Sequence, residues 1–164
     1  MIKNYFSLLF LLFSTCFSYG QVVINELDSD TPGIDDKEFV ELKSATPNFS
    51  LDGYVLVFFN GNAESASTGN KSYLTISLNG LVTDANGLVV IGSNAVSPVP
   101  QKIIADNQIQ NGADAVAVYL GSAADFPDGT LATTTNLIDA LAYDTSDPDA
   151  TQLMGLLGLT IQIN

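Results

Sequence analysis

The sequence predicts an all-β fold, a sandwich or a barrel, and three observations lead to this prediction. Short apolar or alternating segments recur along the chain, separated by Gly, Asn, Asp or Pro. Four Asn-Gly pairs mark tight turns, because both residues tolerate positive φ. Beyond the first twenty residues, no stretch of ten or more keeps the apolar period of an amphipathic helix. Regularly spaced short strands of this kind are typical of β-sandwiches and barrels.

The first half of the chain contains four predicted strands. Val22–Leu27 is apolar and rich in β-branched residues, which favour extended backbone. Glu38–Ser44 alternates between polar and apolar side chains, as a half-buried strand does. Tyr54–Asn60 is a continuous apolar run, which predicts a strand that is covered on both faces. Tyr73–Leu78 alternates and ends at the turn pair Asn79-Gly80.

The second half contains four more predicted strands. Leu88–Gly92 is short and apolar, and Lys102–Ala105 has the least pronounced pattern of the eight. Ala115–Leu120 places its large apolar residues on one face. Leu137–Tyr143 alternates in the same way, with Asp139 as the one interruption.

The N-terminal residues have the layout of a secretory signal peptide. Lys3 precedes an apolar run from Phe6 to Phe17, and small residues precede a predicted cut before Gln21. We therefore expect a signal peptide at 1–20 and one domain at 21–164. This domain is expected to be secreted, in the periplasm or on the cell surface.

A lipoprotein anchored through Cys16 is the rival interpretation of the same residues. Such a signal has Leu three residues before the Cys and a small residue directly before it, where this chain has Phe13 and Thr15. With Cys16 removed, the mature chain has no Cys, so we expect no disulfide framework.

The charge of the chain is strongly negative and limits its partners. It has 18 acidic residues against 5 basic ones, and its formal net charge is -13. Such a surface repels nucleic acid and anionic membranes, so we expect neither as a partner and no membrane insertion after signal removal. Cations, basic protein surfaces and neutral glycans stay open as partners, and so does solubility as the sole role of the charge.

Six segments occur in an order that is informative about the family. The six segments are Val22–Leu27, Glu38–Leu42, Leu51–Leu56, Gly87–Gly92, Ile109–Tyr119 and Ile138–Tyr143. In this order they resemble the lamin-tail domain of secreted bacterial proteins, over residues 22 to 143. The resemblance implies an immunoglobulin-like β-sandwich without catalytic residues, often attached to a nuclease, a phosphatase or a surface protein.

The C-terminal tail departs from the family pattern. Lamin-tail domains usually continue with a Gly-rich turn and a closing strand, whereas this sequence reads Ile161–Asn164 at the corresponding place. One alternative is a sandwich that lacks its last strand and exposes an unpaired edge. The other is that the tail itself pairs as the last strand, because Leu159–Ile163 alternates.

The residue types that the chain lacks exclude several kinds of site. Beyond residue 20 there is no His, Arg, Cys or Trp. Catalysis by Ser-His-Asp or Cys-His, zinc sites with His or Cys ligands, and Arg clamps for phosphate are therefore excluded. A pair of carboxylates among Glu26, Glu38 and Glu41 is the remaining option for a small glycan hydrolase. The absence of Trp for sugar stacking argues against it, and we expect no enzyme.

Calcium is the cation that the sequence favours. Residues 28–36 hold four carboxylates, and a fifth follows, which suits a hard cation that prefers oxygen ligands. The loop is not an EF-hand, because Pro32 and Phe39 occupy two of its ligand positions. The turn Asp144–Asp149 is a second, weaker candidate, and in both places Asp also serves to cap turns. The predicted Ca²⁺ ligands are Asp28, Asp30, Asp35, Asp36 and Glu38.

Together these observations favour a non-catalytic binding or adhesion module with a protein or glycan partner at the cell surface. The alternatives are a Ca²⁺-binding accessory domain derived from a larger nuclease- or phosphatase-type protein, and a small glycan hydrolase. No cofactor is required by the first hypothesis, and Ca²⁺ is the cofactor in the second.

Overall fold

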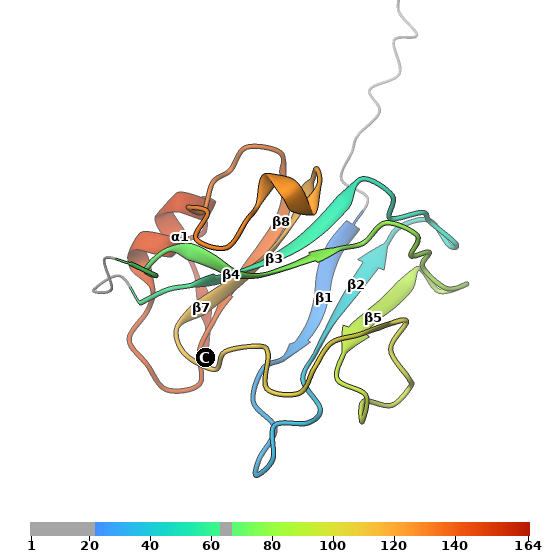
Figure 1. Ribbon diagram of the computed structural model, residues 1–164, viewed down its shortest axis with the longest axis horizontal. Coiled ribbons are helices and arrows are strands. Elements are labelled where there is room, and N and C mark those ends of the chain that lie inside the picture. Colours follow the sequence, from blue (N-terminus) through green and yellow to red (C-terminus); the bar gives the residue numbers. More distant parts are fainter. Residues whose placement is uncertain (1–21, 63–66) are drawn as a thin grey trace, which may run out of the picture.

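The computed structural model describes residues 22–62 and 67–164, so the predicted signal peptide at 1–20 lies outside the described residues. The described chain forms two β-sheets packed against each other (Figure 1), which confirms the prediction of an all-β sandwich. The elements in chain order are β1 (Val22–Asp28), β2 (Phe39–Ser44), β3 (Tyr54–Asn60), β4 (Lys71–Ser77), β5 (Leu88–Gly92), β6 (Lys102–Ile103), β7 (Asp114–Leu120), the 3-10 helix η1 (Ala123–Asp125), β8 (Leu137–Tyr143), α1 (Thr151–Leu157) and β9 (Gln162–Ile163).

The two sheets are mixed. One has the strand order β1-β2-β5-β6 and the other has the order β4-β3-β7-β8-β9. Neighbouring strands are antiparallel except in the pairs β5-β6 and β8-β9, which are parallel. Each parallel pair adds a strand of only two residues at one edge of its sheet.

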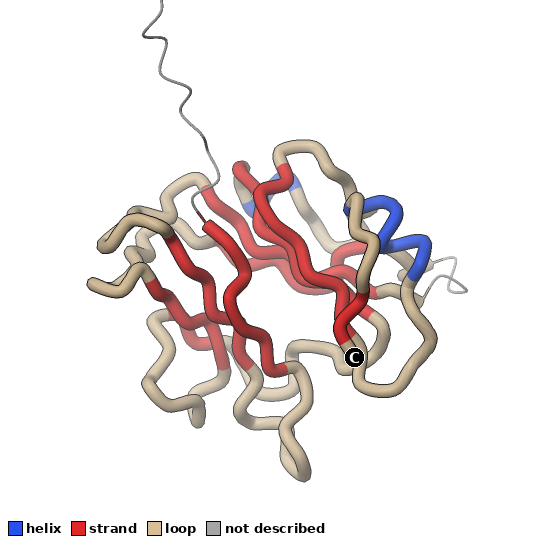
Figure 2. The backbone as a smooth tube through the Cα atoms, turned by 180° about the vertical axis from the view of Figure 1, so that it is seen from behind, coloured by secondary structure: helices blue, strands red, loops and turns tan. Residues whose placement is uncertain are grey.

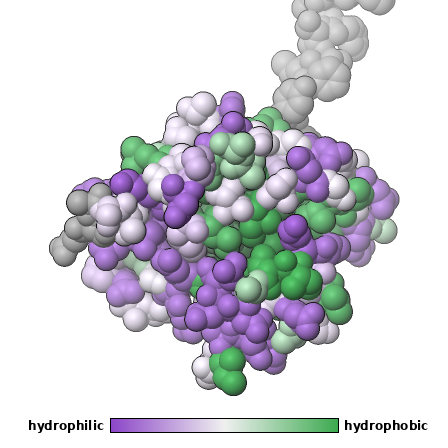
Figure 3. Space-filling model, viewed as in Figure 1, coloured by the Kyte–Doolittle hydropathy of each residue, from purple (hydrophilic) through white to green (hydrophobic). Residues whose placement is uncertain are grey.

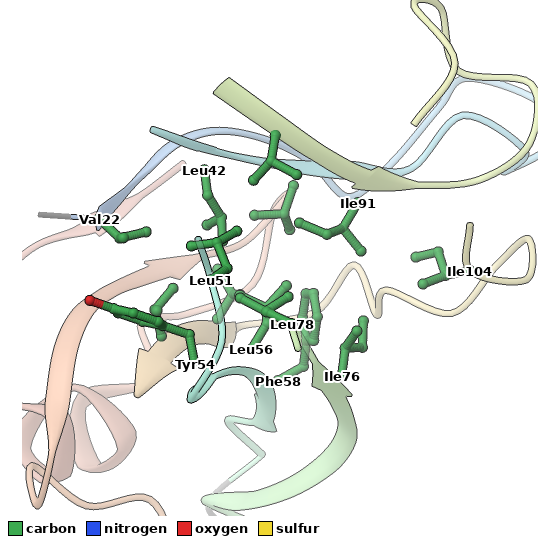
Figure 4. Close-up of a cluster of buried hydrophobic side chains, with 14 of the residues drawn as sticks. Val22, Leu42, Leu51, Tyr54, Leu56, Phe58, Ile76, Leu78, Ile91 and Ile104 are labelled. Carbon is green, nitrogen blue, oxygen red and sulfur yellow. The ribbon is translucent and has the colours of Figure 1, made fainter. Parts of the chain in front are cut away.

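The main core lies between the two sheets. Alternate side chains of each strand point inward, so β2 contributes Val40 and Leu42, and β3 contributes Leu56 and Phe58, all without exposed surface. Figure 4 shows Leu42 from one sheet and Leu56 and Phe58 from the other directed toward one another. Burial of this apolar surface is the main source of stability, because the described residues contain no disulfide.

A second hydrophobic layer covers the outer face of the five-stranded sheet. The other set of β3 side chains, including Val57 and Phe59, packs there against α1, which buries Leu153 and Leu157. Figure 2 shows α1 outside this sheet, on the side away from the other sheet. The continuous apolar run of β3 was expected to be covered on both faces, and this layer is the second cover.

The tail supplies both α1 and β9. The helix is only seven residues long, and the residue after it, Gly158, caps its end with a φ of 71°, which is favourable for Gly. After it, Gln162 pairs with Ala142, and its side-chain oxygen accepts a hydrogen bond of 2.9 Å from the Ala150 N–H. Of the two alternatives for the tail, the structure therefore has the one in which the tail pairs with the sheet. In the described part of the chain, no helix is long and apolar enough to cross a membrane.

Candidate functional site

The acidic loop between β1 and β2 projects from one end of the sandwich (Figure 1), and its predicted ligands have unequal surroundings. Glu38 is fully buried at the base of this loop. Its carboxylate accepts hydrogen bonds from the N–H groups of Gln108 (2.7 Å) and Ile109 (3.2 Å). Burial raises the pKa of Glu38 to about 7, against the opposing effect of these two bonds, and the nearby charge of Asp35 raises it further.

Each of the four Asp residues of the loop makes at least one hydrogen bond, through its carboxylate or through its backbone N–H. The carboxylates of Asp28 and Asp35 accept bonds from backbone N–H groups two and four residues away. Asp30 accepts a bond of 3.2 Å from the side chain of Asn111, and Asp36 bonds through its backbone N–H to the carbonyl of residue 34. Among residues 22–62 and 67–164, no group of three or more acidic, His or Cys side chains is arranged to hold a metal ion. The structure brings together Asp35 and Glu38, and Ca²⁺ binding stays a prediction.

The candidate hydrolase carboxylates divide into one neighbouring pair and one residue apart from it. Glu26 and Glu41 lie opposite each other across the β1–β2 pair, and Glu41 accepts a bond of 2.7 Å from the Asn25 side chain. Glu38, in contrast, is buried and bound to residues 108 and 109. The structure thus places two of the three acids side by side on one sheet.

A cleft of about 550 Å³ lies where the end of β3, the start of β7 and the start of α1 come together, and we call it the Asp114 cleft. Its lining includes Thr151 and Gln152 at the start of α1, the helix on the left in Figure 1. Its size is in the range of small-molecule sites. The lining residues are Asn60, Gly61, Asn62, Gln110, Gly112, Ala113, Asp114, Asp147, Pro148, Asp149, Ala150, Thr151 and Gln152.

Asp114 has the most unusual surroundings in this cleft. The residue is only 3% exposed, and its Oδ1 accepts a hydrogen bond of 2.8 Å from the Gly61 N–H. Its Oδ2 is buried and has no hydrogen-bond partner among the described residues. Burial raises the pKa of Asp114 to about 6, against the effect of the Gly61 bond, and the charge of Asp147 raises it further.

The fold holds the cleft walls in place. A Cβ on Gly61 would lie 1.8 Å from the carbonyl oxygen of Ala113, so only Gly allows this close approach. Gln110, whose side chain accepts a bond of 2.9 Å from the Asn60 amide, is fixed by two tyrosines: Tyr73 Oη accepts a bond of 3.0 Å from the Gln110 N–H, and Tyr143 donates one of 3.1 Å to the Gln110 carbonyl. This part of the cleft wall is therefore preorganised by backbone contacts.

The lining of the cleft is polar and acidic. It contains the carboxylates of Asp114, Asp147 and Asp149 and four side-chain amides, and none of the described lining residues is basic or aromatic. On the face seen in Figure 1, Figure 3 shows hydrophobic atoms gathered near the middle and mostly hydrophilic atoms around them. The chemistry available in the cleft is acceptance of hydrogen bonds and attraction of positive charge.

Sequence reasoning found one half of this site. The acidic turn Asp144–Asp149 was singled out as a candidate, whereas Asp114 was not. The signal that marks Asp114 is its position as the first residue of a strand whose next five residues are all buried. Because the strand is buried, a carboxylate at its first position becomes buried with it.

A smaller groove of about 280 Å³ lies between β1 and the pair β8-β9. Asp144 is on its wall, and the side chain of Asp144 accepts a hydrogen bond from Gln162.

Comparison of the chain with family models, with curated proteins and with solved structures finds no match. The resemblance to lamin-tail domains thus remains an expectation from the sequence.

Proposed function

We propose that this chain is a non-catalytic binding module of a secreted or cell-surface protein and that its ligand docks in the Asp114 cleft. The observation that carries the proposal is the Asp114 carboxylate, which is buried and has one oxygen without a partner among the described residues. An unsatisfied buried acceptor costs about 1–3 kcal/mol, and more when it is charged. A ligand that donates a hydrogen bond to this oxygen recovers that cost.

Two further properties support a binding role. The walls of the cleft are positioned by backbone hydrogen bonds to Asp114 and around Gln110, so little order has to be gained on binding. The chain beyond residue 20 also lacks His, Arg, Cys and Trp, which carry most nucleophilic, zinc-dependent and phosphate-transfer chemistry. A lamin-tail-like module of a larger exported protein fits both properties.

The experiment is a binding panel with the purified protein, read by calorimetry. The panel contains neutral oligosaccharides, basic peptides and acidic peptides, and the variants are Asp114→Asn and Asp106→Asn. Asp106 is an exposed acid outside the cleft, so its variant makes the same change in charge. We expect saturable binding of at least one class, weakened about tenfold or more in Asp114→Asn and unchanged in Asp106→Asn. Absence of saturable binding, or turnover of a ligand, would contradict the proposal.

Ca²⁺ binding by residues 28–38 is the second candidate function. The observation that favours it is the placement of Asp35 beside the buried Glu38, at the base of a loop with three more carboxylates. Ca²⁺ takes six to eight oxygens, so the other Asp side chains have to turn toward this pair. Thermal unfolding is measured in EDTA and in millimolar Ca²⁺. A rise of several degrees in Tm that Asp30→Ala and Asp35→Ala abolish supports the site, and an unchanged Tm excludes it.

A further inference from the structure

We propose that the Asp114 cleft recognises a primary ammonium group, presented either by a small amine such as an amino sugar or by a lysine side chain of a partner protein. This inference rests on the proposed binding function and names the chemistry of the ligand. It follows from four features of the cleft: its charge, its free acceptor, its size and the absence of aromatic side chains among its described lining residues.

The charge of the cleft selects a cation. Three carboxylates line it, and no described lining residue carries a positive charge. Asp114 and Asp147 lie close enough for the charge of one to disfavour ionisation of the other. A ligand cation between them relieves this repulsion, whereas an anionic ligand adds to it.

The free acceptor selects a ligand with N–H donors. The Gly61 N–H occupies Oδ1 of Asp114, and Oδ2, which is buried in the wall of the cleft, has no partner among the described residues. An ammonium group has three N–H donors and makes charge-assisted bonds, which are shorter and stronger than neutral ones. An ammonium group that donates to Asp114 therefore keeps further donors for the other acidic side chains of the lining, and the charge of Asp147 already acts on Asp114.

The size and ligand set of the cleft argue against a bare metal ion. Among the described residues, no three acidic side chains are arranged around one point where an ion would bind. The cleft has room for a group of many atoms, about 550 Å³, and its four amide side chains line the remaining space. Amides pair with hydroxyl or peptide groups, which accompany the ammonium in an amino sugar or a lysine residue.

The lining also distinguishes between kinds of organic cation and sugar. Quaternary ammonium groups are bound by aromatic cages, and sugars commonly stack on aromatic rings. Since no described lining residue is aromatic, recognition in the cleft depends on hydrogen bonds and charge. A primary ammonium fits this chemistry better than a methylated one or a neutral sugar.

The test uses two matched pairs of probes with the purified protein, titrated by calorimetry at pH 7.5. One pair is glucosamine and N-acetylglucosamine, and the other is Nα-acetyl-lysine methylamide and its Nε-acetylated form. Acetylation removes the positive charge and keeps most of the shape. We expect each amine to bind about tenfold or more tightly than its acetylated form. Tighter binding of the lysine probe indicates a protein partner, and tighter binding of glucosamine indicates a saccharide.

Variants tie the binding to the cleft. Asp114→Asn keeps the acceptor for Gly61, and Asp147→Asn changes an exposed side chain, so one variant stays informative if the other fails to fold. Both are expected to weaken amine binding about tenfold, and Asp106→Asn to leave it unchanged. Equal binding of amine and acetylated probe, or no binding of either amine, overturns the ammonium inference. The binding function itself then still stands if a ligand of the panel binds in an Asp114-dependent way.

Discussion

Glu38 and Ile109 are 71 positions apart in the sequence and are joined by a hydrogen bond of 3.2 Å from the Ile109 N–H to the buried carboxylate. The neighbouring Gln108 N–H donates a second bond to the same group. These bonds fasten the segment before β7 to the base of the β1–β2 loop, and that segment continues into Gln110 and Asp114 on the wall of the cleft. The geometry of the cleft thus depends on a residue outside it.

The first prediction concerns the pH dependence of stability. The pKa values of Glu38 and Asp114 are raised in the fold to about 7 and about 6, so the folded state binds protons more tightly than the unfolded one. Their contribution to stability is complete below their ordinary pKa values and is lost as the pH rises through the raised ones. Asp52 and Asp84 have lowered pKa values, so their contribution to stability is lost as the pH falls. This loss occurs at a lower pH than the range in which Glu38 and Asp114 titrate. We expect the Tm to fall by several degrees between pH 5 and pH 8, measured by calorimetry.

Glu38→Gln isolates the contribution of one group to this profile. The variant is less stable at every pH. The two oxygens of Glu38 accept one N–H each, whereas a Gln side chain has a single oxygen and leaves one N–H without an acceptor. Its Tm is expected to depend on pH about half as steeply as that of the native protein, since Asp114 still titrates. An unchanged slope would show that Glu38 is already ionised in the folded protein at pH 5.

The strands could be predicted because their pattern is local. Tyr54–Asn60, Leu88–Gly92 and Leu137–Tyr143 have the same bounds in sequence and structure, since alternation or a continuous apolar run encodes each of them. Helix α1 could not be predicted in this way. It has seven residues with Gly155 among them, so it shows less than two full turns, and it is stabilised by packing on the outer face of a sheet.

The candidate site could be predicted only in part, because its residues meet through strand pairing. The register of β7 on β8 places Asp114 opposite Tyr143, and the acidic turn that begins at Asp144 therefore follows directly beside it. Each half looks like an ordinary turn in the sequence. Likewise, the acidity of the β1–β2 loop was visible, but the burial of Glu38 depends on a partner segment some seventy residues away.

The second prediction tests the close approach at Gly61. A Cβ there would lie 1.8 Å from the Ala113 oxygen and 2.6 Å from the Ala150 Cβ, so Gly61→Ala forces the cleft walls apart. We expect a loss of about 2–3 kcal/mol in the free energy of unfolding, measured in urea. Gly155→Ala is the matched control, because a Cβ at this helical position meets nothing within 4 Å, and it is expected to gain about 0.5–1 kcal/mol. Equal effects of the two variants would contradict the described packing of the cleft.

The third prediction tests the second hydrophobic layer. Leu153 on α1 has no exposed surface, and its truncation leaves a cavity between the helix and the sheet. We expect Leu153→Ala to lower the free energy of unfolding by about 3 kcal/mol in urea denaturation. Ile161→Ala removes a side chain that is 74% exposed and is expected to change it by less than about 0.5 kcal/mol. If both variants cost the same, α1 does not pack on the sheet as described.

The last prediction is the pH dependence of ammonium binding. The lysine probe stays protonated between pH 5 and pH 8, because the ordinary pKa of an amine of this kind is about 10. Asp114 changes its charge in this range, since its pKa is about 6. Binding to the ionised carboxylate therefore weakens as the pH falls through 6, and the affinity at pH 5 is expected to be about tenfold lower than at pH 7. Calorimetric titrations at several pH values measure this profile, with the protein checked for a folded state at each.

Asp114→Asn provides the control for that profile. The amide does not titrate, so its residual affinity is expected to be the same at pH 5 and pH 7, while Asp106→Asn keeps the native profile. A native affinity that does not change with pH would mean that Asp114 is not the group that meets the cation. A pH dependence that persists in Asp114→Asn would mean that another carboxylate of the cleft meets the cation. Asp147→Asn then tests whether that carboxylate is the exposed Asp147.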